Sequence, residues 1–327
     1  MSLRKTSAAA SAPGKIILFG EHFVVYGSHA ILASINRRIK VNVCLNKSQT
    51  INIRSNLGII GSYKGSEFTL VKGGEKAKEI LDLIFKCVSC VLSERKQNLG
   101  ININLISEIP YGVGLGSSAA CCVATVAAVD SLFHEPNKQW ICVKAVECER
   151  LVHKNSSGAD CYISVFGGLM HYIKDERFKK IKTKKDSTLI IINTGMKHST
   201  GDLVSLVKKF RDQNVLLFIE LTSYADTICQ QALTAINNGD EKKLGELMNE
   251  NHALLQQIGV SHRKIDHAVQ ICIRNGALGA KLTGAGGGGS MIALIPNENK
   301  MRIISEIEKS KFECIPVTFD YNGLITY

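Results

Sequence analysis

The stretch "EIPYGVGLGSSAACC", residues 108–122, places three glycines, Gly112, Gly114 and Gly116, directly before a long apolar segment. Glycine loses more backbone entropy on folding than other residues, so three of them at alternate positions need a structural reason. A helix that begins after them would present unpaired N–H groups and the positive end of its dipole. Because glycine lets an anion approach these groups closely, the stretch predicts a phosphate-binding loop. Tight packing of the helix against a strand is the alternative that these residues leave open.

The pattern of apolar residues extends the prediction in both directions from this loop. In the first half of the chain it predicts strands over 14–21, 35–46, 99–110 and 161–173, and helices over 75–96, 118–133 and 136–153. In the second half it predicts a strand over 187–195, helices over 200–212, 215–238 and 240–256, and a further helix capped by Ser261 and ended by Gly276. The segment "GALGAKLTGAGGGGSMIALI", residues 276–295, then predicts a strand, a glycine loop and a strand.

Length and composition favour a globular protein of two domains. The chain has 327 residues, of which 45% are hydrophobic, and its longest apolar run is too short to span a bilayer. The net charge of +11 suits anionic partners such as nucleic acid, a membrane face or phosphorylated and carboxylated metabolites. Much of this charge lies in "KDERFKKIKTKK", residues 174–185, which we interpret as a surface hairpin near the domain boundary. No aromatic residues alternate with the lysines there, so the segment does not resemble a nucleic-acid arm.

The eleven cysteines show no pairing pattern. Cys87 and Cys90 form one C-x-x-C motif, but no second pair follows at the spacing of a zinc site. Cys87 repeats with its apolar neighbours at helical spacing, which indicates a small core residue. Many unpaired thiols are typical of a reducing compartment, and we therefore expect a cytoplasmic protein.

Five further polar residues are candidates for chemistry, although each has an ordinary interpretation. Lys15 lies inside an apolar strand, where lysine usually extends its amine to solvent. Glu149 ends a helix and Asp160 follows a turn, and an isolated carboxylate is usually only solvated. Glu21 and His22 follow the first strand, and a single histidine is more often structural than catalytic. The run "GAGGGG" matches a dinucleotide-binding pattern trivially, because a strand follows where that pattern needs a helix.

Four sequence blocks that occur together favour a functional role for these residues. They are "PGKIILFGEHFVVYG" at 13–27, "PYGVGLGSSAA" at 110–120, "ECERLVHKNSSGAD" at 147–160 and "KLTGAGGGGS" at 281–290. In this order they resemble the GHMP kinase superfamily, which phosphorylates small metabolites with ATP. Within it, "GEH" followed by "VVYG" is similar to the mevalonate kinases, as is "NTGMKHSTGDLV" at 193–204. Thr200 falls on a threonine of that segment, whereas His198 stands where relatives usually have arginine.

The resemblance implies an α+β fold with the active site in a cleft between two domains. Residues 1–185 would form a domain like ribosomal protein S5 domain 2, and residues 186–327 would form a ferredoxin-like domain. The implied reaction is ATP-dependent phosphorylation of the primary hydroxyl of mevalonate to 5-phosphomevalonate, in isoprenoid precursor synthesis. The implied cofactor is Mg²⁺ and the implied partners are ATP and mevalonate, with a possible homodimer and neither nucleic acid nor membrane.

The resemblance also assigns residues to roles. The ATP phosphates would lie on Gly112, Val113, Gly114, Leu115, Gly116, Ser117 and Ser118. Mg²⁺ prefers hard oxygen ligands, which Ser118 and Glu149 would supply. Asp160 would act as general base and Lys15 would hold it ionised and stabilise the developing charge. The acceptor would be oriented by Glu21, His22, Thr200, Gly284, Ala285 and Gly286.

Three other functions stay open at this point. A phosphomevalonate kinase or another small-alcohol kinase would carry the same blocks. A ligand sensor without activity would share the fold, although such a protein has no need of a base beside a lysine. An RNA-binding protein would explain both the basic charge and an S5-like domain, and its binding would weaken steeply with salt.

Overall fold

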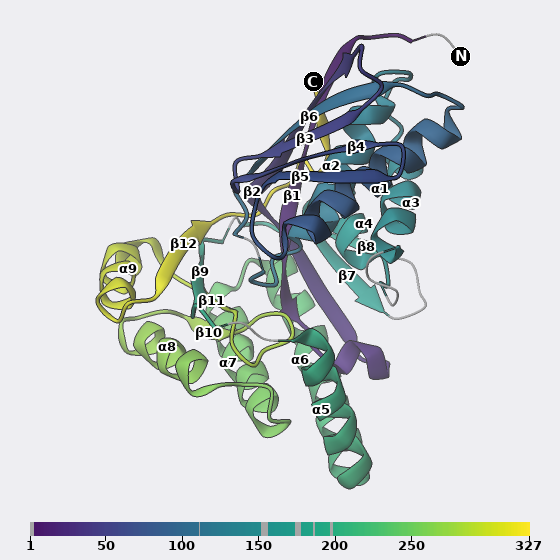
Figure 1. Cartoon of the computed structure of the whole chain (residues 1–327). Coiled ribbons are helices and arrows are strands. Elements are labelled where there is room, and N and C mark those ends of the chain that lie inside the picture. The colour runs from purple at the N-terminus through teal and green to yellow at the C-terminus, as the bar shows by residue number, and fades with distance from the viewer. Residues whose placement is uncertain (1–2, 111, 152–155, 174–177, 186, 197–198) are drawn as a thin grey trace.

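The computed structural model describes residues 3–110, 112–151, 156–173, 178–185, 187–196 and 199–327. Two sheets organise the molecule, a nine-stranded sheet and a four-stranded sheet (Figure 1). The chain passes from the first to the second after residue 181, and its last strand returns to the first sheet. The α+β class is therefore confirmed, while the division into domains 1–185 and 186–327 stays a prediction.

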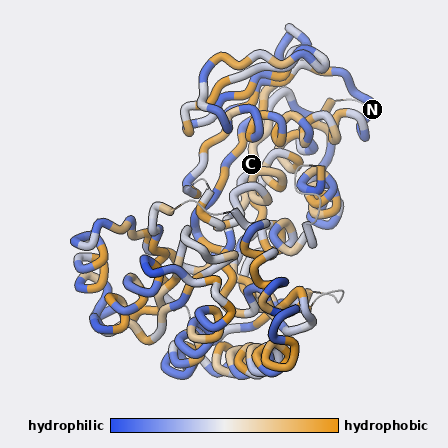
Figure 2. Tube along the Cα trace, turned by 60° about the horizontal axis from the view of Figure 1, so that its bottom comes forward, coloured by the Kyte–Doolittle hydropathy of each residue, from blue (hydrophilic) through white to orange (hydrophobic). Residues whose placement is uncertain are grey.

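The first sheet runs in the order β13-β1-β2-β6-β3-β4-β5, and β7 pairs with both β2 and β8. Its strands are β1 (Ser7–Phe19), β2 (His29–Asn46), β3 (Ile51–Ser55), β4 (Ile59–Lys64), β5 (Glu67–Lys72), β6 (Gly100–Ser107), β7 (Leu169–Ile173), β8 (Lys179–Ile181) and β13 (Ile325–Thr326). Hydrophobic and hydrophilic residues alternate in the part of the molecule that holds this sheet (Figure 2), and buried residues alternate with more exposed ones along β3, β4 and β6, which is the pattern of a sheet with one covered face.

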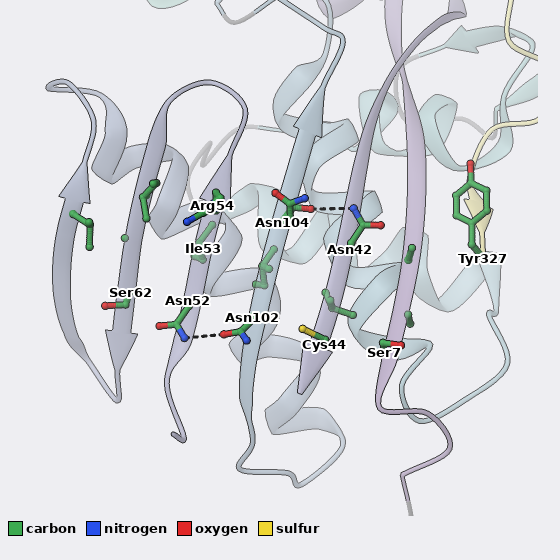
Figure 3. A pocket seen from close by; sticks show the side chains of 17 residues that line it. Ser7, Asn42, Cys44, Asn52, Ile53, Arg54, Ser62, Asn102, Asn104 and Tyr327 are labelled. Carbon is green, nitrogen blue, oxygen red and sulfur yellow. Dashed lines mark hydrogen bonds between the residues drawn. The ribbon is translucent and has the colours of Figure 1, made fainter. Parts of the chain in front are cut away.

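Four helices accompany this sheet, α1 (Ala77–Glu94), α2 (Ser117–Asp130), α3 (Lys138–Arg150) and α4 (Ala159–Phe166). Helix α2 contacts β1 and β2 and is buried along its whole length from Ala119 to Asp130, as its uniformly apolar sequence predicts. The opposite face of the sheet is open. It forms a hollow of about 860 Å³ that is lined by short polar side chains such as Asn42, Asn52, Asn102 and Asn104 (Figure 3).

The second sheet has the strand order β10-β11-β9-β12, with every neighbouring pair antiparallel. Its strands are β9 (Leu189–Asn193), β10 (Gly279–Leu282), β11 (Ser290–Leu294) and β12 (Glu313–Val317), and its helices are α5 (Thr200–Gln213), α6 (Val215–Asn238), α7 (Glu241–Gln257), α8 (Arg263–Arg274) and α9 (Lys300–Lys309). Helices separate β9 from β10 and β11 from β12 in the chain. This is the β-α-β-β-α-β arrangement of a ferredoxin-like domain.

Two local predictions are wrong. The segment 161–173 is a helix followed by a strand, because α4 starts after Gly158 and stops at Gly167, both of which have positive φ. Its β-branched and aromatic residues favour a strand, but burial against β1 and α2 decides for a helix. The cap of α8 is His262, which accepts a hydrogen bond from the Lys264 amide. The Ser261 hydroxyl instead donates to Asp266 at 2.5 Å.

Arg38 in β2 anchors the returning C-terminal segment to the first sheet. Its guanidinium pairs with Asp320 and donates to the carbonyls of Ser11, at 2.9 Å, and Gly323, at 2.5 Å. The Asp320 carboxylate is buried and also accepts hydrogen bonds from the amides of Asn322 and Gly323. One cation therefore ties the last strand to β1 and β2.

We expect Arg38→Met to lower the free energy of unfolding by about 3–5 kcal/mol, because it leaves Asp320 as an uncompensated buried charge. Urea denaturation of both proteins measures the loss. The double variant Arg38→Met/Asp320→Asn removes both charges and should recover most of it. A loss below about 1 kcal/mol in the single variant would mean that the pair does not anchor the segment.

Candidate active site

A cleft of about 730 Å³ lies where β1, the glycine loop before α2 and the glycine loop after β10 meet. Of the residues that were predicted from the sequence, those lining the cleft are Lys15, Glu21, His22, Gly112, Gly114, Leu115, Gly116, Ser117, Ser118, Glu149, Asp160, Thr200, Gly284 and Ala285. They come from six separate segments of the chain. The fold therefore brings together almost all of the predicted candidates.

The loop before α2 has the conformation that its glycines predict. Gly112, Gly114 and Gly116 have φ of 78°, 80° and 71°, in the left-handed region where other residues are strained. Helix α2 begins at Ser117 with Gly116 as its cap, and glycine has no side chain that could accept from the first N–H groups of the helix. These groups and the helix dipole make the loop suitable for an anion.

The first strand and the glycine loop fix each other's position. The Lys15 amide donates to the Leu115 carbonyl at 2.9 Å. A Cβ atom on Gly14 would lie 2.8 Å from that carbonyl oxygen, and a Cβ on Gly116 would lie 2.8 Å from Lys15 Cγ. From the other side, the Ser290 hydroxyl donates to the Val113 carbonyl at 2.9 Å. The loop is thus held between β1 and β11.

Lys15 and Asp160 form an ion pair inside the cleft, with Nζ 3.2 Å from Oδ2. The Lys15 side chain is 8% exposed, whereas that of Asp160 is 36% exposed. Asp160 lies in the first turn of α4, where the helix dipole favours a negative charge. The arrangement presents the Asp160 carboxylate to the cleft, with the buried Lys15 amine behind it.

Ser118 and Glu149 fit a metal ion that accompanies the phosphates. The Ser118 hydroxyl oxygen is buried and has no hydrogen-bond partner among the described residues. Glu149 is buried at the end of α3 and accepts a hydrogen bond from Ser156 at 2.6 Å. A hydrogen bond with Cys87 lowers the pKa of Cys122, which lies one turn after Ser118 in α2, but burial and the charges of neighbouring groups, Glu149 among them, raise it. The Glu149 carboxylate therefore acts on this helix from nearby. One hydroxyl and one carboxylate are the sparse protein ligand set that Mg²⁺ usually takes.

Next to the cleft, at the end of β1, lies a wholly buried ion pair between Glu21 and Lys281. Lys281 lies in β10, and its amine also donates to the Leu282 carbonyl at 2.8 Å. Burial raises the pKa of Glu21 and lowers the pKa of Lys281, and each charge opposes the shift of the other. The second oxygen of Glu21 has no hydrogen-bond partner in the part of the chain that the structure describes.

His22 has the strained left-handed φ of 61° and lies 2.8 Å from the Ala285 carbonyl through Nε2. A carbonyl only accepts, so Nε2 carries a proton. Burial lowers the pKa of His22, which keeps the ring neutral and leaves Nδ1 as an acceptor. The sequence predicts that His22 donates a hydrogen bond to the substrate alcohol. In the structure the Nε2–H group of His22 instead donates to the Ala285 carbonyl.

The remaining predicted residues lie around this centre. Thr200 begins α5 and faces the cleft, as do Gly284 and Ala285. Val113 and Gly286 do not line it, since Val113 is buried behind the loop and a Cβ on Gly286 would lie 2.2 Å from the Val260 carbonyl oxygen. Their direct contacts with ligands stay predictions. His198 lies outside the described residues.

The sequence prediction left out three polar side chains that the structure places at the site. Ser156 donates to Glu149, and Lys281 pairs with Glu21. The Thr283 hydroxyl donates to the Ile17 carbonyl at 2.9 Å and accepts from the Ile17 amide at 3.1 Å. Lys281 carries the same signal as Lys15, a lysine within an apolar strand, and could have been found by it.

Comparison with known proteins agrees with this geometry. Residues 82–168 match the family described as "GHMP kinases N terminal domain" and residues 232–313 match "GHMP kinases C terminal". The mevalonate kinase of Pyrococcus abyssi is 38% identical to this chain, over 89% of this chain and 89% of its own length. The mevalonate kinase of Archaeoglobus fulgidus is also 38% identical, over 92% of this chain and 97% of its own length.

The chain belongs to the mevalonate kinase family of the GHMP kinases. The structure agrees, since the crystal structure of L. major mevalonate kinase in complex with R-mevalonate matches with a TM-score of 0.87 and 29% identity, over 98% of this chain and 99% of that one. The protein is therefore a kinase with the GHMP kinase fold, as its sequence blocks predict.

The glycine loop can be tested through the binding of nucleotide. We expect Mg·ATP to raise the melting temperature of the protein and Gly114→Val to abolish most of that shift. A Cβ on Gly114 meets no protein atom within 4 Å, so the new side chain would project into open space beside the loop.

Gly58→Val is the matched control, because Gly58 also has a positive φ and open space around it but lies in the turn between β3 and β4. It should keep the full shift on addition of ATP. A full shift in Gly114→Val would exclude this loop as the phosphate site.

Proposed function

We propose that the cleft transfers the γ-phosphoryl group of ATP to the primary hydroxyl of mevalonate, with Asp160 as general base. The observation that carries this assignment is the ion pair of Lys15 and Asp160 at 3.2 Å, beside a glycine loop that opens α2. A protein that only bound its ligand would need no base next to a buried lysine. The name of the relatives and the R-mevalonate in the L. major complex support mevalonate as the acceptor.

In this proposal the loop from Gly112 to Ser118 binds the triphosphate through backbone N–H groups at the start of α2. Asp160 accepts the proton of the primary hydroxyl while its oxygen forms the new bond to the γ-phosphorus and the bond to ADP breaks. Lys15 orients the Asp160 carboxylate through their ion pair and neutralises charge on the transferring phosphoryl group. Most of the rate enhancement then comes from positioning and charge neutralisation.

Ser118 and Glu149 would hold Mg²⁺, which neutralises phosphate charge when it is bound. The neutral ring of His22 offers Nδ1 to a hydroxyl of the acceptor, and Thr200 offers a hydroxyl from the start of α5. A site that pairs these groups with mevalonate should discriminate strongly against molecules that lack them.

The cellular setting of the reaction is also a proposal. We place the enzyme in isoprenoid precursor synthesis in the cytoplasm, as a possible homodimer. All eleven cysteines are free thiols, which suits a reducing compartment. Among the described residues, no helix combines the length and the apolarity needed to cross a bilayer.

Removal of the base should slow the reaction without preventing binding. We expect Asp160→Asn to lower kcat by about two to four orders of magnitude, because it keeps the size of the side chain but cannot accept the proton. The shift of melting temperature with ATP should stay within experimental error of that of the unmodified enzyme.

The matched control is Asp212→Asn, which removes an aspartate paired with Arg211 outside the cleft and should leave kcat unchanged. Near-normal turnover in Asp160→Asn would favour a mechanism of positioning alone.

The acceptor is tested by ADP release with Mg·ATP and a panel of alcohols. Mevalonate should be the best acceptor, and galactose, homoserine and phosphomevalonate should be poor ones. Preference for phosphomevalonate would assign the protein to the next kinase of the same superfamily. If no alcohol stimulated ADP release, the protein would be a ligand sensor on this fold.

A further inference from the structure

We propose that Lys281 is a positioning residue for the acceptor alcohol, acting through Glu21 and His22. This inference rests on the proposed function, because it assumes that His22 faces the acceptor. In this way the C-terminal half of the chain sets the geometry of a site whose proposed catalytic pair, Lys15 and Asp160, comes from the N-terminal half.

Four side-chain contacts join two short segments, residues 17–22 and 281–285. Lys281 pairs with Glu21, and His22 contacts the Ala285 carbonyl. The Thr283 hydroxyl bonds both the amide and the carbonyl of Ile17. The end of the first strand is thereby closed into a ring with the start of the second glycine loop.

The backbone at His22 is the part of these two segments that depends on the contacts, because it is strained. His22 has a φ of 61°, a backbone conformation that is strained for a residue with a side chain. Two contacts hold this strained conformation in place. Lys281 fixes the Glu21 side chain, and the Ala285 carbonyl fixes the imidazole of His22. Without Lys281, the turn would lose one of its two anchors, and the Nδ1 acceptor would no longer be held in place.

The burial of the pair also points to positioning. The side chains of Glu21 and Lys281 are both 0% exposed, yet Glu21 borders the cleft. A buried ion pair is weak evidence for stability, since apolar residues of similar volume often stabilise as well. Its location at the cleft indicates that it fixes a conformation rather than adds stability.

The charges around Glu21 are known on every side that the structure describes. Burial raises the pKa of Glu21, and the charges of Lys281 in β10 and, more weakly, Lys15 in β1 oppose that rise. Cys229 of α6 and His252 of α7 face the pair as neutral groups, because burial raises the pKa of the thiol and lowers that of the imidazole to about 4. Removal of Lys281 takes away the larger of the two cationic effects. The pKa of Glu21 then rises, so Glu21 becomes protonated at a higher pH than in the unmodified enzyme.

The test compares kinetic constants of Lys281→Met with those of the unmodified enzyme. We expect KM for mevalonate to rise at least about tenfold, while KM for ATP changes less than about twofold. The acid limb of kcat/KM for mevalonate should move to higher pH, which a purely structural role would not produce. Lys185→Met, which breaks an exposed ion pair with Glu241, is the matched control and should change none of these values.

Two further variants keep the proposal testable if Lys281→Met does not fold. Glu21→Gln retains the shape of its side chain and should show the same split between the two KM values. The double variant Lys281→Met/Glu21→Gln leaves no unpaired charge in the interior and should recover the melting temperature but not KM for mevalonate.

Unchanged KM values, or an equal rise in both, would overturn the proposal. Failure of the unmodified enzyme to phosphorylate mevalonate would instead overturn the proposed function.

Discussion

Lys15 can reach Asp160 only because residue 116 has no side chain. A Cβ there would lie 2.8 Å from Lys15 Cγ, and the same glycine caps the helix whose N–H groups face the cleft. The lysine amide in turn holds the loop through the Leu115 carbonyl. The glycine loop and the ion pair of Lys15 and Asp160 therefore form one packing unit. Close packing against β1, one of the two interpretations of the glycines, is present, and the loop is also the proposed phosphate site.

The part of the cleft that is proposed to hold the acceptor is built on a different physical principle. There the chain buries a full ion pair, Glu21 with Lys281, and the backbone is strained at His22. The proposed catalytic pair, Lys15 and Asp160, lies in β1 and α4, but the contacts that hold His22 come from β10 and the loop after it. In the proposed mechanism the relative position of these segments therefore sets the distance between acceptor and phosphate, which suits a reaction whose rate depends on positioning.

Much of the fold and of the candidate site could be predicted from the sequence, wherever local sequence patterns agreed with the resemblance to the kinase superfamily. The glycine loop, the buried helix α2 and the strand–loop–strand around the second glycine run follow from residue type and period, and the structure confirms them. The helix at 159–166 could not be predicted, because its strand-like composition is overridden by packing against β1 and α2. The tautomer of His22 depends on a carbonyl 263 positions away in the chain, and no local pattern contains it. The ion pair of Arg38 and Asp320 could not be predicted either, because it joins residues that lie far apart in the chain.

In the proposed mechanism, Asp160 accepts the proton of an alcohol placed in line with a triphosphate on the glycine loop. A crystal structure of the complex with mevalonate, Mg²⁺ and a non-hydrolysable ATP analogue measures this geometry directly. We expect the primary hydroxyl oxygen within about 2.6–3.2 Å of the Asp160 carboxylate, with the γ-phosphate on the N–H groups at the start of α2. A primary hydroxyl beyond hydrogen-bond reach of Asp160, or a triphosphate bound away from residues 112–118, would exclude this mechanism.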